Sequence, residues 1–295
     1  MNQVAFYIMN LKGYITLKSF IEKYGAGAVA YIVSSEDKAI NKDYFEEISA
    51  LAVRSKIKFF NRSEDFSNLE KSLDVYKFAI GWRWLIKNEK KLIIFHDSIL
   101  PKYRGFAPLV NSLINKESEI GVTALQASEH YDQGNIIAQK KIEINYPIKI
   151  NEAIELIIPL YFYLVNKIFK GINNKDAFKV KKQNEEDATY SPWLDDTDYY
   201  IDWSWSAEKI KRFVDAVGYP YDGAKAYLDK KIINFLDVDI VDDVVIENRN
   251  RHLGKIIFIA NKHPVVICQK GLIRLVDIRD DENNLIDIKF RSRFN

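Results

Sequence analysis

The polar residues best suited to chemistry lie in two short stretches of the chain. The first, FHDSILPKYRG at 95–105, places His96 directly after an apolar run, where a buried strand would end. The second, EHYDQGN at 129–135, contains Asp132. A carboxylate beside an imidazole fixes the tautomer of the ring and stabilises its protonated form. His96 and Asp132 are therefore candidates for a general acid–base pair.

Other interpretations of the HDS sequence are open to test. A serine hydrolase would place its serine on a strained G-x-S-x-G turn, and Ser98 has no flanking glycine. A histidine at a strand end is also often a hydrogen-bonding surface residue without a catalytic role. The four histidines, at 96, 130, 252 and 263, show no metal-ligand spacing, so we expect no metal.

The elements that would position these residues alternate between apolar runs and amphipathic helices. We expect helices at 16–24 and 43–55, and strands at 4–9, 28–35, 56–60, 76–82 and 91–95. This alternation predicts an α/β, Rossmann-like doubly wound sheet of parallel strands. Such sheets bind ligands at the carboxyl ends of their strands. His96 follows the fifth strand and Trp82 the fourth, so both should lie at that edge.

The rest of the chain predicts a second, smaller domain. After strands at 120–128 and 136–144, Asn151 can cap a long helix at 152–170. The polar, aromatic stretch 173–203 is interpreted as a linker, and Ser206 as the cap of the next helix. Short apolar runs beyond Tyr219, ending with 286–290, predict antiparallel strands. We therefore expect a catalytic domain over 1–190 and a β-rich C-terminal domain over 191–295.

Composition narrows the class of protein. The 295 residues carry a formal net charge of +2, so there is no overall attraction to nucleic acid or anionic membranes. Cys268 is the single cysteine, which excludes an intramolecular disulfide. The N-terminus lacks a signal-peptide pattern, and no apolar run is long enough to span a bilayer. These features favour a cytoplasmic protein.

Both polar stretches resemble one family. The 10-formyltetrahydrofolate-dependent formyltransferases share the pattern N-x-H-x-S-x-L-P-x-x-R-G, then G-V-T, then D-x-G. The matching positions here are His96, Ser98, Leu100, Pro101, Arg104, Gly105, Gly121, Val122, Thr123, Asp132 and Gly134. The passage 201–224 resembles the family's entry into its C-terminal domain. The likeness is strongest to the bacterial nucleotide-sugar N-formyltransferases.

The resemblance implies a reaction and a set of site residues. An amine would attack the formyl group of 10-formyltetrahydrofolate, with His96 moving protons and stabilising the oxyanion and Asp132 orienting His96. The folate would contact the loop after the fourth strand and the segment 122–132, through Trp82, Leu85, Ile86, Val122, Tyr131 and Asp132. Trp82 could equally be a core aromatic at the sheet edge. Substrate phosphates would be bound around Lys12, Arg83, Lys102, Tyr103, Arg104 and Gly105.

One position departs from the family pattern. The family's asparagine falls on Ile94, and isoleucine has no hydrogen-bond donor for an oxyanion. Either His96 and a backbone amide serve the oxyanion, or the chain is a non-catalytic relative that binds ligand without turnover. Asn88 is a distant substitute that we do not favour.

The amine that such an enzyme would formylate is a separate question. Residues 191–295 contain about 16 lysines and arginines against about 18 aspartates and glutamates, which disfavours a methionyl-tRNA formyltransferase because tRNA binding needs a basic surface. A dTDP-linked amino-dideoxysugar for O-antigen or surface-glycan synthesis fits better, and the passage YSPWLDD…IDWSW resembles the enzymes for dTDP-4-amino-4,6-dideoxyglucose. The resemblance also implies a homodimer. The aromatic residues at 190–205 are expected to pack the domain junction rather than to stack a base.

Overall fold

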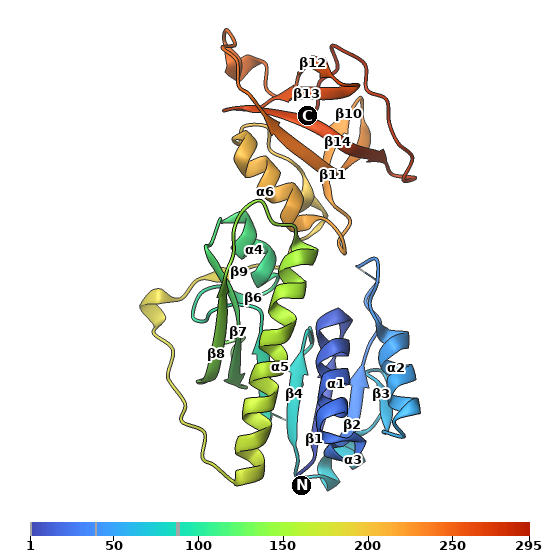
Figure 1. Ribbon diagram of the computed structural model, residues 1–295, viewed down its shortest axis with the longest axis vertical. Coiled ribbons are helices and arrows are strands. Elements are labelled where there is room, and N and C mark those ends of the chain that lie inside the picture. Colours follow the sequence, from blue (N-terminus) through green and yellow to red (C-terminus); the bar gives the residue numbers. More distant parts are fainter. Residues whose placement is uncertain (1, 39, 87–88) are drawn as a thin grey trace. The chain divides into compact units, whose positions relative to one another are not determined.

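The computed structural model describes residues 2–38, 40–86 and 89–295, and the chain divides into two compact units (Figure 1). The first unit comprises Met1–Leu109, Ser118–Ile144 and Ala153–Pro192. The second comprises Val110–Glu117, Asn145–Glu152 and Trp193–Asn295.

The first unit is built on a seven-stranded sheet with the order β3-β2-β1-β4-β5-β7-β8. Neighbouring strands from β3 to β5 are parallel, whereas β7 is antiparallel to both β5 and β8. The strands are β1 (Val4–Ile8), β2 (Val29–Ser34), β3 (Phe59–Asn61), β4 (Tyr76–Ile80), β5 (Leu92–His96), β7 (Glu119–Gln126) and β8 (Ile136–Glu143). The Rossmann-like fold class is therefore confirmed, with a mixed rather than a wholly parallel sheet.

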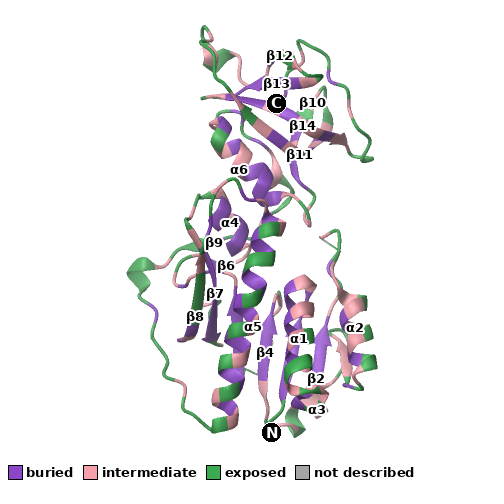
Figure 2. Ribbon diagram, viewed as in Figure 1, coloured by how far each residue is buried: buried purple, intermediate pink, exposed green. Residues whose placement is uncertain are grey.

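Helices cover both faces of this sheet, and its central strands are almost wholly buried (Figure 2). On one face Phe6 packs edge-on against Phe20 of α1, with ring centroids 5.0 Å apart. On the other face Tyr7 reaches α3, where it donates a hydrogen bond to Glu70. The helices of the unit are α1 (Asn10–Tyr24), α2 (Phe45–Arg54), α3 (Ser67–Ser72), α4 (Pro108–Ile114, shared with the second unit) and α5 (Ile150–Asn174, mostly in the first unit).

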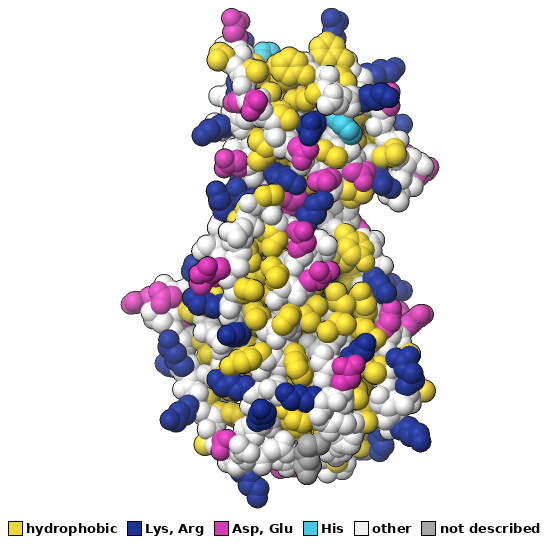
Figure 3. All heavy atoms as spheres, viewed as in Figure 1, with side chains coloured by type: hydrophobic (Ala, Val, Ile, Leu, Met, Phe, Trp, Pro, Cys, Tyr) yellow, Lys and Arg dark blue, Asp and Glu magenta, His cyan; other side chains and the backbone are white. Residues whose placement is uncertain are grey.

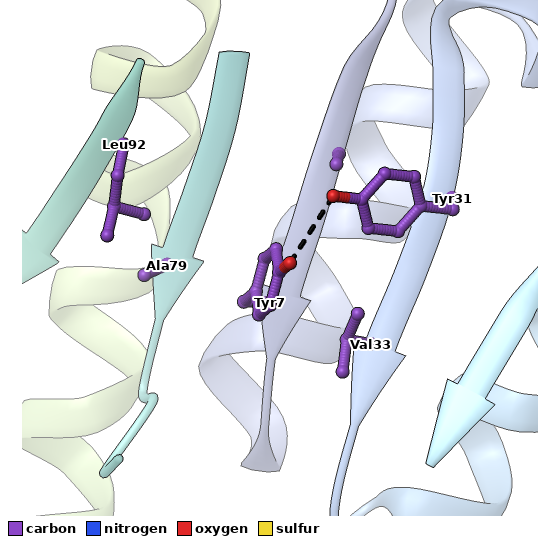
Figure 4. Close-up of a cluster of buried hydrophobic side chains, with 6 residues drawn as sticks. Tyr7, Tyr31, Val33, Ala79 and Leu92 are labelled. Atoms are coloured by element: carbon purple, nitrogen blue, oxygen red, sulfur yellow. Dashed lines mark hydrogen bonds between the residues drawn. The ribbon is translucent and has the colours of Figure 1, made fainter. Parts of the chain in front are cut away.

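The face that carries Tyr7 also carries a polar cluster inside an apolar one (Figure 4). The hydroxyl of Tyr31 lies 3.3 Å from that of Tyr7, which donates to Glu70 over 2.8 Å. Lys77 of β4 is ion-paired with the same carboxylate at 3.3 Å. Val33, Ala79 and Leu92 supply apolar contacts around it. The charges are thus paired where the sheet excludes water, as burial of charge requires.

Three local expectations are corrected. The helix expected from 152 begins at Ile150, so Asn151 lies within its first turn and does not cap it. The strand expected at 76–82 ends at Ile80, which leaves Trp82 and its neighbours in a loop. The stretch 173–192 is no linker, because it belongs to the first unit and contributes β9 (Tyr190–Ser191), which pairs with β6 (Arg104–Gly105).

The second unit contains a five-stranded antiparallel sheet with the order β10-β11-β14-β13-β12. Its strands are β10 (Ala224–Leu228), β11 (Lys231–Val241), β12 (Ile256–Ala260), β13 (His263–Ile267) and β14 (Leu272–Asp280). The hydroxyl of Ser206 caps α6 (Ala207–Val217) by accepting from the backbone N–H of Lys209, as expected. The strand expected at 286–290 is not formed. Among the described residues, no helix is both long and apolar enough to cross a bilayer.

Candidate active site

His96 is the last residue of β5, and each nitrogen of its ring has a polar neighbour. Nε2 lies 2.7 Å from the backbone carbonyl oxygen of Tyr103. Nδ1 lies 3.5 Å from Oδ1 of Asp132. The ring is largely buried, with 8% of its surface exposed. The structure thus brings together the two side chains proposed as an acid–base pair, and their catalytic role stays a prediction.

The contact with Tyr103 determines the tautomer of the neutral ring. A carbonyl oxygen can only accept a hydrogen bond, so Nε2 of His96 must carry the proton. Nδ1 then presents a lone pair toward the Asp132 carboxylate. Two acceptors cannot bond each other, but they can share a donor or a proton. The pair is therefore arranged to receive the N–H groups of an amine, or a proton taken from one.

Asp132 lies in a tightly fixed loop between β7 and β8. Its backbone adopts a left-handed conformation with φ 55°, and its Oδ2 accepts a hydrogen bond of 2.9 Å from the N–H of Gly105. Gly134 follows in the same loop, where a Cβ atom would lie 1.7 Å from the carbonyl oxygen of Gln126. Only glycine allows that approach, so the loop can lie flat against the end of β7.

Arg104 does not face a substrate site. Its side chain is fully buried, and its guanidinium donates two hydrogen bonds to Glu185, at 2.7 and 2.9 Å. The same group donates to Gln183 and to the hydroxyl of Tyr190, both at 3.0 Å. The hydrogen bonds that Arg104 donates to the Glu185 carboxylate raise the pKa of Arg104 above its ordinary value. This arrangement contradicts the prediction that Arg104 binds a substrate phosphate, because its donors are occupied within the protein.

The neighbours of Arg104 act through their backbones. Gly105 has φ 96°, and a Cβ atom there would lie 2.7 Å from the carbonyl oxygen of Ser191. Gly105 was predicted to lie near the substrate phosphates, whereas the backbone that approaches it closely is that of β9. Tyr103, at φ 60°, presents its carbonyl to His96 and donates its N–H to Oγ1 of Thr189 over 2.8 Å.

The other cationic candidates differ in their surroundings. Lys12 is buried and forms an ion pair with Asp97. Arg83 donates from Nη1 to Asp37 over 2.9 Å, with 46% of its side chain exposed. Lys102 is exposed on the loop that follows His96. Of the candidates, Arg83 and Lys102 keep charge at the surface, so they are the ones that we retain for binding phosphate.

The loop after β4 offers an apolar surface. Trp82 packs edge-on against Tyr7, with ring centroids 5.4 Å apart, and Ile86 packs against the same buried cluster. The indole Nε1 of Trp82 is buried without a hydrogen-bond partner among the described residues. Leu85 and Tyr131 are 70% and 54% exposed. The exposed side chains of Leu85 and Tyr131 suit a flat ring such as a pterin.

Two further positions bear on the site. Val122 is wholly buried within β7, which contradicts its predicted contact with folate. Ile94 is half-buried, shares a face of β5 with His96, and packs against Leu125 and its neighbours. Asn88 lies outside the described residues. Among the residues described, no three His, Cys, Asp or Glu side chains gather to form a metal site.

Four residues that hold this region together were not predicted as part of the site from the sequence. They lie in the stretch that we interpreted as a linker, about 80 positions beyond the loop they contact, and they are Gln183, Glu185, Thr189 and Tyr190. The one signal was the density of hydrogen-bonding side chains in QNEEDATY, which equally describes a solvated loop.

Comparison with known families agrees with the expected resemblance. A model described as formyl transferase matches residues 22–153, and one described as formyl transferase, C-terminal domain, matches 194–293. Together the two models account for most of the chain. The chain belongs to the formyl transferase family. The family assignment that the residues around His96 and Asp132 predicted is thereby confirmed.

Two curated relatives differ in the part of their length that this chain matches. A methionyl-tRNA formyltransferase of Acetivibrio thermocellus is 27% identical over 194 residues, which cover 66% of this chain and 61% of the relative. The bifunctional polymyxin resistance protein ArnA of Wigglesworthia glossinidia brevipalpis is 29% identical over 293 residues, which cover 93% of this chain and 42% of the relative. The chain therefore spans less than two thirds of each of these relatives.

Solved formyl transferase structures show the same fold over nearly the whole chain. An N-formyltransferase of Helicobacter canadensis, in complex with folinic acid and dTDP-3-aminofucose, has a TM-score of 0.70 at 18% identity. It matches 93% of this chain and 99% of its own. WlaRD, a sugar 3N-formyl transferase solved with dTDP and 5-N-formyl-THF, has a TM-score of 0.68 at 17% identity and matches 93% and 97% of the two chains.

Proposed function

We propose that this formyl transferase moves a formyl group from 10-formyltetrahydrofolate to the amine of a dTDP-linked amino-dideoxysugar. The observation that carries the proposal is the approach of Nδ1 of His96 to Oδ1 of Asp132, 3.5 Å apart in a largely buried site. Membership of the family supplies the reaction class, and the two solved neighbours bound to dTDP ligands support the substrate class. A cytoplasmic homodimer remains part of the proposal.

The proposed roles follow from the tautomer of His96. An amine that attacks a formyl group must lose a proton, and the free lone pair of Nδ1 is the base that faces it. The protonated ring then has an N–H at Nδ1, directed at Asp132 and at the reacting atoms. Asp132 stabilises the positive charge, and the carbonyl of Tyr103 keeps the other ring proton in place. The same N–H can stabilise negative charge or return the proton to a leaving nitrogen.

The folate would supply the activated formyl carbon. Trp82, Leu85, Ile86 and Tyr131 would hold its rings, because Leu85 and Tyr131 expose apolar surface and Trp82 and Ile86 pack against the buried cluster of the sheet. Trp82 is itself held by its edge-on contact with Tyr7, so its ring is preorganised by the buried cluster on this face of the sheet.

The diphosphate of the substrate would be bound by Lys102 and Arg83, whose charges reach the surface. The best candidate for the sugar is dTDP-4-amino-4,6-dideoxyglucose, which rests on the resemblance of the 190–205 passage. The 3-amino isomer is the competing candidate, since both solved neighbours act on or bind 3-amino or 3N sugars.

Methionyl-tRNA formyltransferase is the second candidate, because relatives with that name match two thirds of the chain. The surface charge of the second unit disfavours this candidate. Acidic and basic side chains are interspersed over the face of the second unit seen in Figure 3, with no basic patch there for a phosphate backbone. A third candidate is a relative that binds ligand without turnover, because the isoleucine at position 94 offers no hydrogen-bond donor to an oxyanion.

One experiment separates the three. The purified protein is incubated with 10-formyltetrahydrofolate and, in parallel, with dTDP-4-amino-4,6-dideoxyglucose, its 3-amino isomer or charged initiator tRNA. We expect a formylated dTDP-sugar by mass spectrometry and no salt-sensitive tRNA binding. Formylated methionyl-tRNA would favour the second candidate. Binding of nucleotide and folate with no formylated product in any reaction would favour the third.

A further inference from the structure

Residues 181–191 contact both the loop that follows His96 and the loop that carries Asp132. Lys181 exchanges two backbone hydrogen bonds of 2.8 Å with Ile136, at the start of β8. Thr189 donates its backbone N–H to the carbonyl of Pro101, in the loop after His96. The segment lies between the stretches that the two family models match, 22–153 and 194–293.

Gln183 is the central residue of this segment. Its side chain is buried, and its Nε2 donates to the backbone carbonyls of Asp132 and Gly134, at 2.7 and 2.8 Å. Its Oε1 accepts from Nε of Arg104 over 3.0 Å. A single amide thus fixes both sides of the loop that carries Asp132. No other neutral side chain of this length provides two donors and an acceptor at one end.

The side-chain amide of Gln183 is held in turn by Arg104. Arg104 donates three further side-chain hydrogen bonds, two to Glu185 and one to Tyr190, and its backbone N–H donates to the carbonyl of Thr189 over 2.8 Å. The loop cannot move without breaking hydrogen bonds of this network, in which Gln183 and Arg104 are buried and Glu185 and Tyr190 are exposed. Because unpaired buried polar groups are costly, the bond between the amide of Gln183 and the guanidinium of Arg104 is favoured.

We propose that Gln183 is a positioning residue, which holds the Asp132 loop so that Oδ1 faces Nδ1 of His96. The proposal rests on the proposed function insofar as it concerns rate. Glutamate has nearly the same shape but offers the two carbonyls no donor and adds a negative charge, so Gln183→Glu releases the loop. Displacement of a catalytic group by about 1 Å can reduce the rate by about 10²-fold.

The kinetic test compares Gln183→Glu with the same chemical change elsewhere in the first unit. Asn173→Asp is the matched control, since its side-chain amide donates to the carbonyl of Phe169 at the end of α5. We expect Gln183→Glu to lower kcat by about 10- to 10²-fold with KM for both substrates within about threefold. Asn173→Asp should retain wild-type kinetics. If Gln183→Glu does not fold, Gln183→Met, which has equal length and no charge, takes its place.

A double-mutant cycle distinguishes positioning from general damage. In an Asp132→Asn background, Gln183→Glu should cause little further loss of kcat, because the group it positions is already disabled. If the losses multiply instead, Gln183 does not act through Asp132, and the proposal is overturned.

An activity-free measurement covers the case in which the proposed substrate is wrong. The chain has four histidines, so the ring nitrogens of His96 can be assigned by nitrogen-15 NMR with His96→Ala as reference. We expect the Nδ1 signal of His96 to shift in Asp132→Asn and to shift likewise in Gln183→Glu, but not in Asn173→Asp. An unchanged Nδ1 signal in Gln183→Glu, or in its Gln183→Met substitute, refutes the positioning role whether or not any sugar is formylated.

Discussion

Nδ1 of His96 and Oδ1 of Asp132 lie 3.5 Å apart with no proton between them in the neutral tautomer, because Nε2 donates to the carbonyl of Tyr103. The pair is thus two acceptors that face each other. Such an arrangement is favourable when a donor or a proton joins them. It is a suitable environment for an amine that must lose a proton as it reacts.

The first prediction concerns both members of this pair. His96→Ala removes the base and Asp132→Asn removes the negative charge that stabilises its protonated form, so each should lower kcat by about 10²-fold or more. KM for the folate and for the dTDP-sugar should change much less, since neither side chain is needed for apolar contact. Steady-state kinetics with mass-spectrometric detection of product measures both constants.

His130→Ala is the control for this pair, because His130 is exposed in the same loop and its side chain has no assigned role. It should behave as wild type. Turnover that survives in both His96→Ala and Asp132→Asn would remove the basis of the mechanism, although not of the family assignment.

The second prediction concerns Ile94, which the resemblance places at the position of the family's asparagine. If His96 and a backbone amide already serve the oxyanion, Ile94→Asn should change kcat by less than about tenfold. A gain of about 10²–10³ would instead show that the wild-type site lacks its donor. Single-turnover rates of formyl transfer distinguish these outcomes.

Ile94→Leu is the matched control, since it preserves volume and adds no donor. Ile94 packs against Leu125 at the sheet, so Ile94→Asn should also lower the free energy of unfolding, by about 1–3 kcal/mol. Thermal unfolding of both variants separates a loss of stability from a change in chemistry.

The sequence predicted most of the first unit because its strands are buried on both faces. Runs such as VAFYIM and LIIF are apolar throughout, and that composition is typical of strands that are buried on both faces. The direction of β7 was not predictable, because an antiparallel strand that is buried on both faces has the same composition as a parallel one. The prediction of a strand at 286–290 was wrong because five residues of alternating polarity fit a surface loop as well as a strand.

The candidate site was predictable only where the residues lie close together in sequence or match a family pattern. His96 and Asp132 were identified in this way. The side chain of Arg104 was assigned to substrate because a guanidinium near a glycine suits phosphate, whereas its true partner, Glu185, is 81 positions away. Contacts at such separation leave no periodicity or spacing in a single sequence, so Gln183 and Thr189 could not be found.

The third prediction concerns Gly134, which shapes the Asp132 loop. Gly134→Ala would place a methyl group against the backbone of Gln126, with the new Cβ only 1.7 Å from the carbonyl oxygen. The loop must shift, so we expect kcat to fall by at least about tenfold and the free energy of unfolding to fall by about 1–3 kcal/mol. Gly27→Ala is the control, because a Cβ there meets nothing within 4 Å. Equal behaviour of the two variants would show that the loop tolerates movement.

The last prediction concerns pH and the buried phenols. Burial raises the pKa of Tyr31 from 10.0 to about 12 and that of Tyr7 further, because an ionised phenol cannot be solvated inside the sheet next to Glu70. A group whose pKa is raised by folding binds its proton more tightly in the folded state. Its contribution to stability is therefore present below pH 10 and is lost as the pH rises from 10 toward 12.

Tyr31→Phe removes the ionisable hydroxyl of Tyr31, so the free energy of unfolding should fall less steeply with pH above 10 than in the wild type. At neutral pH the variant should be less stable by about 1 kcal/mol, because it lacks the hydrogen bond to Tyr7. Urea unfolding of wild type and variant at neutral pH and between pH 10 and 12 measures both effects. Tyr146 and Tyr200 also have pKa values raised to about 12, so the difference between the two proteins, not the wild-type curve alone, reports on Tyr31. Tyr219→Phe, on an exposed ring, should leave the free energy of unfolding unchanged at neutral pH. Parallel alkaline curves for wild type and Tyr31→Phe would mean that the phenol ionises without opening the sheet.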